Sequence, residues 1–171
     1  MAIKFAPPPI RPKNQDPKGK KKTEALATEA RARMLYASHT ETLACVSQNP
    51  YSRLDCILHD LHSIRAVVEI KSRTISRDKI REYGSYLISS HKIDAGVNTS
   101  KALGAPFICI VALDDGIITW VVTSKGGKKL FKYDVEEREM QKNVNGGKKV
   151  GEVALLPVEE MNEFIPWRDK L

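Results

Sequence analysis

Seven consecutive apolar residues, Phe107 to Leu113, place the strongest constraint on how this chain folds. Pro106 precedes the run and an Asp-Asp-Gly turn follows it, so the run has the length and flanking signals of a β-strand. A strand without alternating polar residues is buried on both faces, which requires structure on both sides of its sheet. The sequence therefore predicts an α/β domain with a mixed central sheet flanked by helices.

The other apolar patterns predict the order helix, three strands, helix and two strands. Thr23 is the expected cap of the first helix, whose expected apolar face is Leu26, Ala30, Met34 and Ala37. The expected bounds are a helix over 23–37, strands over 42–47, 52–59 and 64–72, a helix over 76–104 that continues or is re-capped at Asp94, and strands over 107–113 and 117–122.

The last quarter of the chain is less regular. Gly126-Gly127 and Gly146-Gly147 are each followed by two lysines, a pattern typical of solvated hairpin tips. Backbone amides of such turns also bind phosphate, so that alternative stays open. We expect short strands over 129–133 and 150–156 and a helix from Val158 to Ile165. Residues 23–171 are then one domain, with a core over 23–123 and an elaboration over 124–171.

The formal net charge of +7 is concentrated at the N-terminus. Residues 1–22 contain seven basic and one acidic side chain, whereas the rest of the chain is nearly neutral. We expect these residues to form a flexible tail that attracts phosphate backbones without sequence preference and with strong salt dependence. A tail that only increases solubility is the alternative.

Cysteine usage and hydropathy indicate a cytoplasmic protein, in the host cytoplasm if the chain is phage-encoded. Three cysteines without CxxC spacing, Cys45, Cys56 and Cys109, are expected to be reduced core residues. No apolar run approaches the roughly 18–20 residues of a membrane span, and the N-terminus has no apolar signal segment. We therefore expect no membrane partner.

Two charges interrupt another apolar segment, Ala66 to Ser72, at Glu69 and Lys71. Side chains alternate along a strand, so these two share one face and the aliphatic residues beside them occupy the other. Charge within a core is costly and indicates a function. Asp55 belongs to the preceding expected strand. Two acids from neighbouring strands, with a lysine beside them, can hold a divalent metal and cut a phosphodiester.

In this interpretation Asp55, Glu69 and the Ile70 carbonyl are oxygen ligands of Mg²⁺, for which Mn²⁺ is a substitute. Lys71 positions or deprotonates the attacking water, or stabilises charge that develops on the phosphate. The alternative is ordinary structure, with Glu69 and Lys71 as a solvent-facing ion pair and Asp55 as a strand-end cap.

The order of elements around Asp55 and Glu69-Ile70-Lys71 resembles the PD-(D/E)xK, or restriction-endonuclease-like, nuclease superfamily. The resemblance covers residues 23–123, with Leu54 where many members have proline. It implies an αβββαββ core with C-terminal β additions, and an endonuclease that hydrolyses DNA with Mg²⁺. The stretch from Tyr86 to Lys92, taken together with the turn at 114–116, is similar to small phage-encoded members.

The resemblance also implies further site residues. A glutamate of the first helix assists at the metal in many members, and Glu29 is the expected one, with Glu24 as the alternative. Glu29 has an ordinary explanation too, an ion pair with Arg33 one turn away. The expected nucleic-acid contacts are Arg73, Lys79, Tyr83 and Lys92, although Tyr83 at this spacing also suits a core position.

Other functions stay open at this stage. A catalytically inactive nucleic-acid-binding module of the same fold is the main alternative, and an interaction protein that docks its basic tail on an acidic partner is another. The histidines lack the paired spacing of a zinc site. A homodimer is consistent with one site cutting one strand, but no dimer surface is recognisable in the sequence.

Overall fold

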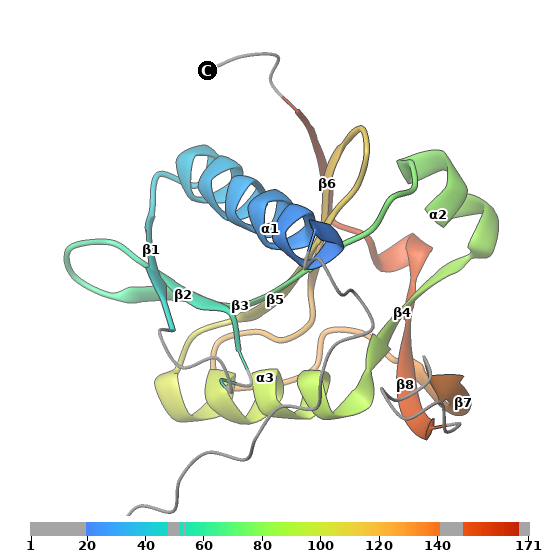
Figure 1. The fold of residues 1–171 in the computed structure, drawn as a ribbon. Helices are drawn as coiled ribbons and strands as arrows, with labels where there is room; N and C mark the ends of the chain where they lie inside the picture. The colour runs from blue at the N-terminus through green and yellow to red at the C-terminus, as the bar shows by residue number, and fades with distance from the viewer. Residues whose placement is uncertain (1–19, 48–51, 53, 141–148, 168–171) are drawn as a thin grey trace, which may run out of the picture.

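A six-stranded mixed sheet in the order β1-β2-β3-β5-β6-β9 forms the centre of the protein (Figure 1). The computed structural model describes residues 20–47, 52, 54–140 and 149–167. The elements are α1 (Lys20–His39), β1 (Leu43–Val46), β2 (Cys56–His59), β3 (Ile64–Ser72), α2 (Arg77–Tyr83), β4 (Ser85–Ser89), α3 (Ser90–Leu103), β5 (Phe107–Ala112), β6 (Gly116–Val121), β7 (Asp134–Met140), β8 (Lys149–Pro157), η1 (Val158–Glu160) and β9 (Glu163–Pro166).

The two middle strands, β3 and β5, are parallel, and their neighbours on either side run antiparallel to them. Alternate residues of β5 enter two separate cores, as expected for a strand covered on both faces. Phe107 and Cys109 pack on the side of α3, whereas Ile108 and Ile110 pack on the side of α1. Figure 1 shows the two helices on opposite sides of the sheet. The predicted α/β class with a mixed, helix-flanked sheet is confirmed.

The first helix presents a different face to the sheet from the one expected. It begins at Lys20, so Thr23 lies inside it rather than at its cap. Leu26 and Met34 are more than half exposed, whereas Ala32 and Tyr36 are buried against β3 and β5. The predicted apolar face is therefore wrong for Leu26 and Met34, whereas Ala37 is buried as expected. Glu29 lies one turn before Ala32 on the inner face, which directs it toward the sheet.

The predicted helix over 76–104 is interrupted by a strand, which corrects that prediction. Gly84 adopts φ +70 and donates its N–H to the Arg81 carbonyl, which ends α2 after seven residues. A left-handed conformation of this kind is readily adopted only by glycine. The next five residues form β4, which pairs with β8 in a separate three-stranded sheet, β4-β8-β7. Tyr86 and Ile88 of β4 point into the core on the α3 side.

The C-terminal part also differs from the prediction. Residues 129–133 form no strand apart from one bridge between Lys129 and Thr123, and the longer strand β7 follows at Asp134. The predicted helix from Val158 to Ile165 is a single 3₁₀ turn followed by β9, which adds to the edge of β6. The Gly146-Gly147 turn and the tail up to residue 19 lie outside the described residues.

All three cysteines are free thiols, but only Cys56 and Cys109 are core residues. Cys45 is exposed on β1, at the edge of the sheet, which corrects the expectation for that residue. Among the described helices, none combines the length and the apolar character needed to cross a membrane.

Candidate active site

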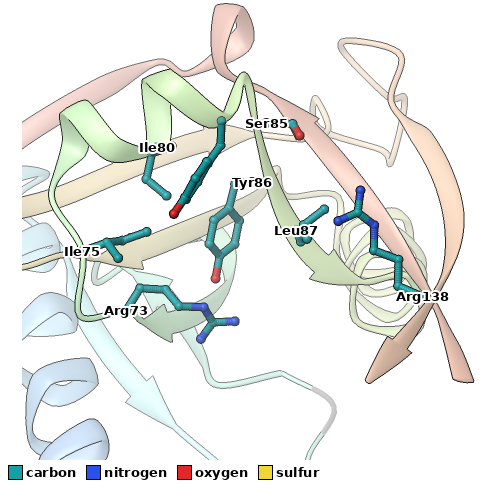
Figure 2. Close-up of a pocket in the computed structure, with 8 residues that line it drawn as sticks. Arg73, Ile75, Ile80, Ser85, Tyr86, Leu87 and Arg138 are labelled. Atoms are coloured by element: carbon teal, nitrogen blue, oxygen red, sulfur yellow. The ribbon is translucent and has the colours of Figure 1, made fainter. Parts of the chain in front are cut away.

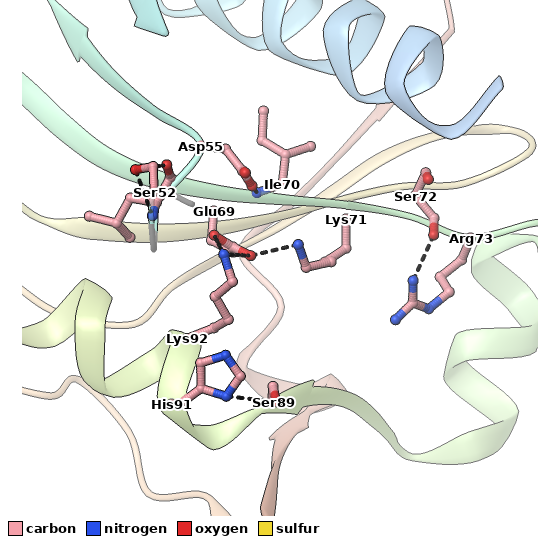
Figure 3. Close-up of polar contacts among 11 residues, drawn as sticks. Ser52, Asp55, Glu69, Ile70, Lys71, Ser72, Arg73, Ser89, His91 and Lys92 are labelled. Carbon is pink, nitrogen blue, oxygen red and sulfur yellow. Dashed lines mark hydrogen bonds and ion pairs between the residues drawn. The ribbon is translucent and has the colours of Figure 1, made fainter. Parts of the chain in front are cut away.

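Glu69 is the centre of the candidate site. It lies in the middle of β3, is 0% exposed, and points to the side of α3 (Figure 3). Its Oε1 lies 2.6 Å from Nζ of Lys71, two residues along the same strand face. A fully buried carboxylate requires partners of opposite charge, because desolvation of an unpaired ion costs several kcal/mol. The predicted shared face of Glu69 and Lys71 is present.

A second lysine reaches the same carboxylate from another element. Lys92, in the first turn of α3, places Nζ 3.2 Å from each of the two oxygens of Glu69. Its side chain is 19% exposed, so it belongs to the buried cluster rather than to an outer groove. The sequence suggested a contact to nucleic acid for Lys92, and the structure places it on the central carboxylate instead.

Asp55 lies beside β3, immediately before β2 begins. Its Oδ2 accepts a hydrogen bond of 2.6 Å from the backbone N–H of Ile70, and its own N–H donates to the carbonyl of Val68. The side chain thus occupies the edge of β3 just past the end of its pairing with β2. Its carboxylate is fixed one residue from Glu69.

Glu29 joins the same edge from α1. The backbone N–H of Ser72 donates a hydrogen bond to its carboxylate, and Lys71 and Asp55 both act on its charge. Burial raises the pKa of Glu29, an effect that Lys71 only partly opposes. The structure therefore brings Glu29 to the cluster, whereas Glu24 lies exposed one turn earlier on the helix.

The Ile70 carbonyl lies at this edge of β3, between the carboxylates of Asp55 and Glu29. The N–H and C=O of one residue point to the same side of a strand. Because the N–H of Ile70 bonds to Asp55 and that of Ser72 bonds to Glu29, the intervening carbonyl opens toward both acids. The carboxylates of Asp55 and Glu29 and the carbonyl of Ile70 thus lie together at one short stretch of β3.

The carboxylates control the charge of Lys71. Burial alone lowers the pKa of this amine, but Glu69, Asp55 and Glu29 outweigh it and leave the pKa above its ordinary value. For Glu69, burial raises the pKa, Lys71 and Lys92 lower it, and Asp55 raises it again, with a net rise. In the absence of metal, Lys71 is therefore a cation at neutral pH and cannot accept a proton.

The donor set fits a hard divalent cation. Mg²⁺ takes one or two protein carboxylates and keeps several waters, so Asp55, Glu69 and the Ile70 carbonyl are sufficient. Among the described residues, Glu69 Oε1 is a buried oxygen without a hydrogen bond of good geometry, despite its ion pairs. No group of three His, Cys, Asp or Glu side chains in the described ranges forms a ready metal cage. Asp55, Glu69 and the Ile70 carbonyl are the groups that would hold such a cation.

The remaining candidates lie outside this cluster. Arg73 is exposed, follows Lys71 on the same side of the strand, and stacks its guanidinium 5.5 Å from the ring of Tyr86. Lys79 pairs with Glu82 at 2.6 Å and covers the ring of Tyr83. Tyr83 is 59% exposed, which excludes the core alternative for it.

Sequence reasoning did not place Lys92 on Glu69. The two residues are 23 positions apart, and the lysine stands in a short polar segment that has no periodic pattern of its own. The only available signal was the buried charge of Glu69, which requires more positive charge than one lysine supplies.

The chain is similar to a solved structure and to a family model. In fold it is similar to Hjc, a Holliday junction resolvase of the archaeal hyperthermophile Archaeoglobus fulgidus, with a TM-score of 0.41 and 14% identity over 54% of this chain and 74% of that chain. No curated protein matches it in sequence. A family model described as "Phage putative PDDEXK endonuclease" matches residues 12–158, which is most of the chain. The protein therefore belongs to the phage putative PDDEXK endonuclease family.

Proposed function

We propose that this protein is a Mg²⁺-dependent nuclease that hydrolyses phosphodiester bonds in DNA, with Mn²⁺ able to replace Mg²⁺. The observation that carries the proposal is the convergence of Glu29, Asp55 and Glu69 on Lys71 at one edge of β3. These three carboxylates come from α1, from the residue before β2 and from β3, and the lysine that they surround is half-buried. They have no evident value for stability, because each brings a desolvation cost. They do have the composition that binds a cation beside a phosphate.

The roles of the residues follow from their positions. Asp55, Glu69 and the Ile70 carbonyl hold the cation, whose chemistry when bound is to lower the pKa of a water and to polarise a phosphoryl oxygen. Lys71 stabilises the charge that develops on the phosphate while it remains protonated. A cation held beside Lys71 would lower the pKa of this amine, and the neutral amine would then be able to accept a proton from the attacking water. Glu29, whose pKa is raised, is suited to hold a proton during turnover.

Cleavage of supercoiled, linear and single-stranded DNA with Mg²⁺ or with EDTA tests the proposal. Wild-type protein should cut with Mg²⁺ only, and Asp55→Asn and Lys71→Met should reduce the rate by about 100-fold or more. Asp94→Asn is the control, since Asp94 is exposed on α3 away from the cluster. Equal cleavage by Lys71→Met and wild type would remove Lys71 from the mechanism. Cleavage in EDTA would overturn the metal dependence.

An inactive nucleic-acid-binding module is the second candidate. The pairing of Glu69 with both Lys71 and Lys92 supports it, because the two ammonium groups already neutralise the carboxylate. A metal titration separates the two functions. A nuclease should show a melting temperature that rises with Mg²⁺, by an amount set by the ratio of metal concentration to Kd, whereas a binding module should show no rise.

A further inference from the structure

A pocket of about 540 Å³ lies next to the carboxylate cluster, beyond Arg73 (Figure 2). Its size falls within the range of pockets that bind small ligands. Arg73 lines it and follows Lys71 by two residues on the same side of the strand, a separation of about 7 Å along the chain. The pocket is therefore one nucleotide or so away from the position at which a bound phosphate would meet Lys71.

The walls of the pocket are apolar and aromatic. Ile75 precedes α2, Ile80 and Tyr83 belong to α2, and Leu87 belongs to β4. Tyr83 leaves more than half of its surface exposed at the rim of the pocket. Flat apolar surfaces of this kind suit a planar aromatic ring, because stacking requires a face rather than a specific set of hydrogen bonds.

The inner wall carries a polar atom that lacks a partner. Tyr86 is 4% exposed and stacks on Trp120 with ring centroids 5.7 Å apart, yet its hydroxyl has no hydrogen-bond partner among the described residues. Buried hydroxyl groups are normally satisfied, so a polar group that enters the pocket can supply the partner of this one. Besides Trp120, the exposed guanidinium of Arg73 lies over the Tyr86 ring, and a shift of this side chain toward a phosphate would open the hydroxyl to the pocket.

The charge of the pocket favours a phosphate-linked ligand. Arg73 and Arg138 approach it from opposite ends, and Arg138 is paired with Glu136 at 2.9 Å. No acidic side chain is among the lining residues of the pocket in the part of the chain that the structure describes. A nucleotide combines a planar base with flanking phosphates, and so matches apolar walls between two arginines. A peptide or a free aromatic molecule would make no use of the second arginine.

We propose that this pocket binds the base of an unpaired nucleotide next to the phosphodiester that the carboxylate cluster cleaves. The inference rests on the proposed function and adds a substrate class to it. A base within a continuous duplex cannot reach the pocket without leaving the stack, whereas an overhang, flap or mismatch supplies an unpaired base at little cost. The protein should therefore prefer DNA in which a nucleotide beside the cut is unpaired.

The first test measures binding in EDTA, so that no cleavage is required. Two duplexes carry one unpaired nucleotide, which is adenine in the first and an abasic site in the second. Wild-type protein should bind the adenine duplex about 5- to 150-fold more tightly, the range expected for one stacked base. Tyr83→Ala should lose this difference, because a wall of the pocket is removed. Tyr133→Ala is the matched control, since Tyr133 also carries a lysine over its ring but lines a different cavity.

The second test uses Tyr86→Phe, which keeps the ring and removes only the unpartnered hydroxyl. This variant should fold as stably as wild type, bind the abasic duplex equally well, and bind the adenine duplex more weakly than wild type does. Equal wild-type affinity for the adenine and abasic duplexes would overturn the proposal and leave only phosphate contacts. If the protein prefers the adenine duplex but shows no Mg²⁺-dependent cleavage, the nuclease function is refuted, whereas base binding in the pocket is supported.

Discussion

Glu69 is an ionised side chain with no exposed surface, held by one lysine from its own strand and one from α3. Breaking a buried ion pair by removal of one partner is strongly destabilising, because the other charge stays buried and unpaired. Replacement of the whole cluster by apolar residues would in contrast be tolerated. The cost of burying the cluster is therefore consistent with the proposed function.

The variant Glu69→Gln tests how much the ion pairs of Glu69 contribute to stability and to cleavage. The side chain keeps its shape, but the two lysines lose their common negative partner, so cleavage should be lost. Because burial raises the pKa of Glu69 despite both lysines, and the lysines keep 28% and 19% of their side-chain surface exposed, the fall in unfolding free energy should be smaller than the about 3–5 kcal/mol of a fully buried pair. Urea unfolding of the metal-free protein measures the change. Glu82→Gln is the control, because its pair with Lys79 is exposed and should contribute about 1 kcal/mol or less. A loss below that level in Glu69→Gln would mean that the lysines are not buried against it in solution.

Glu29→Gln should stabilise the protein at neutral pH. The pKa of Glu29 in the folded protein is raised above its ordinary value of 4.5, chiefly by burial, so the charged form costs folding free energy at pH 7. The gain in melting temperature should disappear as the pH falls through the raised pKa toward 4.5, where wild-type Glu29 is protonated as well. Glu24→Gln, on the exposed side of the same helix, is the control.

The sequence was sufficient to find part of this cluster. Alternation in β3 placed Glu69 and Lys71 on one face, since strand periodicity is a local property. The contact between Lys92 and Glu69 was missed because it depends on how α3 crosses β3. The inner face of α1 was misjudged because Leu26 and Met34 are apolar yet exposed, while the small Ala32 is buried. Apolar side chains on a surface are common, so composition alone did not reveal the face.

At the scale of elements, α3 determines where Lys92 stands, and its distance from the sheet depends on Gly96. A Cβ at this position would lie 2.2 Å from the ring of Phe107 on β5. The helix can approach the strand closely only because no side chain intervenes. The small size of residue 96 on the buried face of α3 therefore also determines where Lys92, in the first turn, lies.

Gly96→Ala should push α3 away from β5 and destabilise the protein by about 1–3 kcal/mol, as expected for overpacking of a filled core. Thermal unfolding measures the loss, and Asn98→Ala on the exposed side of the same helix is the control. Activity per folded molecule should also fall, because Lys92 moves with the helix. Unchanged stability would mean that the Phe107 ring has room to turn aside.

The break between α2 and β4 shows why element type was harder to predict than element order. Ser85–Ser89 has three central apolar residues, which suit a helix or a short strand equally well. Its state is decided by Gly84, which ends α2, and by β8, whose pairing residues follow more than sixty positions later. The apolar strand Phe107–Ala112, in contrast, was predictable because its long uninterrupted pattern needs no distant partner.

At the scale of the whole molecule, the basic charge and the active site are separated along the sequence. Deletion of residues 1–19 removes four basic side chains and one acidic side chain. We expect weaker DNA binding at moderate salt and a smaller slope of log affinity against log salt, by up to about 0.9 for each lost phosphate contact. Binding titrations at several salt concentrations measure this, and the maximal cleavage rate should not change. An unchanged slope would indicate a tail that does not contact DNA.

The two lysines that pair with Glu69 have a consequence for how the proposed nuclease responds to removal of its metal. Because Lys71 and Lys92 already pair with the Glu69 carboxylate, the protein does not need a metal ion in order to fold. Stripping and restoring the ion should therefore turn hydrolysis off and on without passing through a denatured intermediate. A metal ion has to compete with the amines of Lys71 and Lys92 for Glu69. The fraction of protein that holds metal should therefore follow the free metal concentration rather than remain saturated.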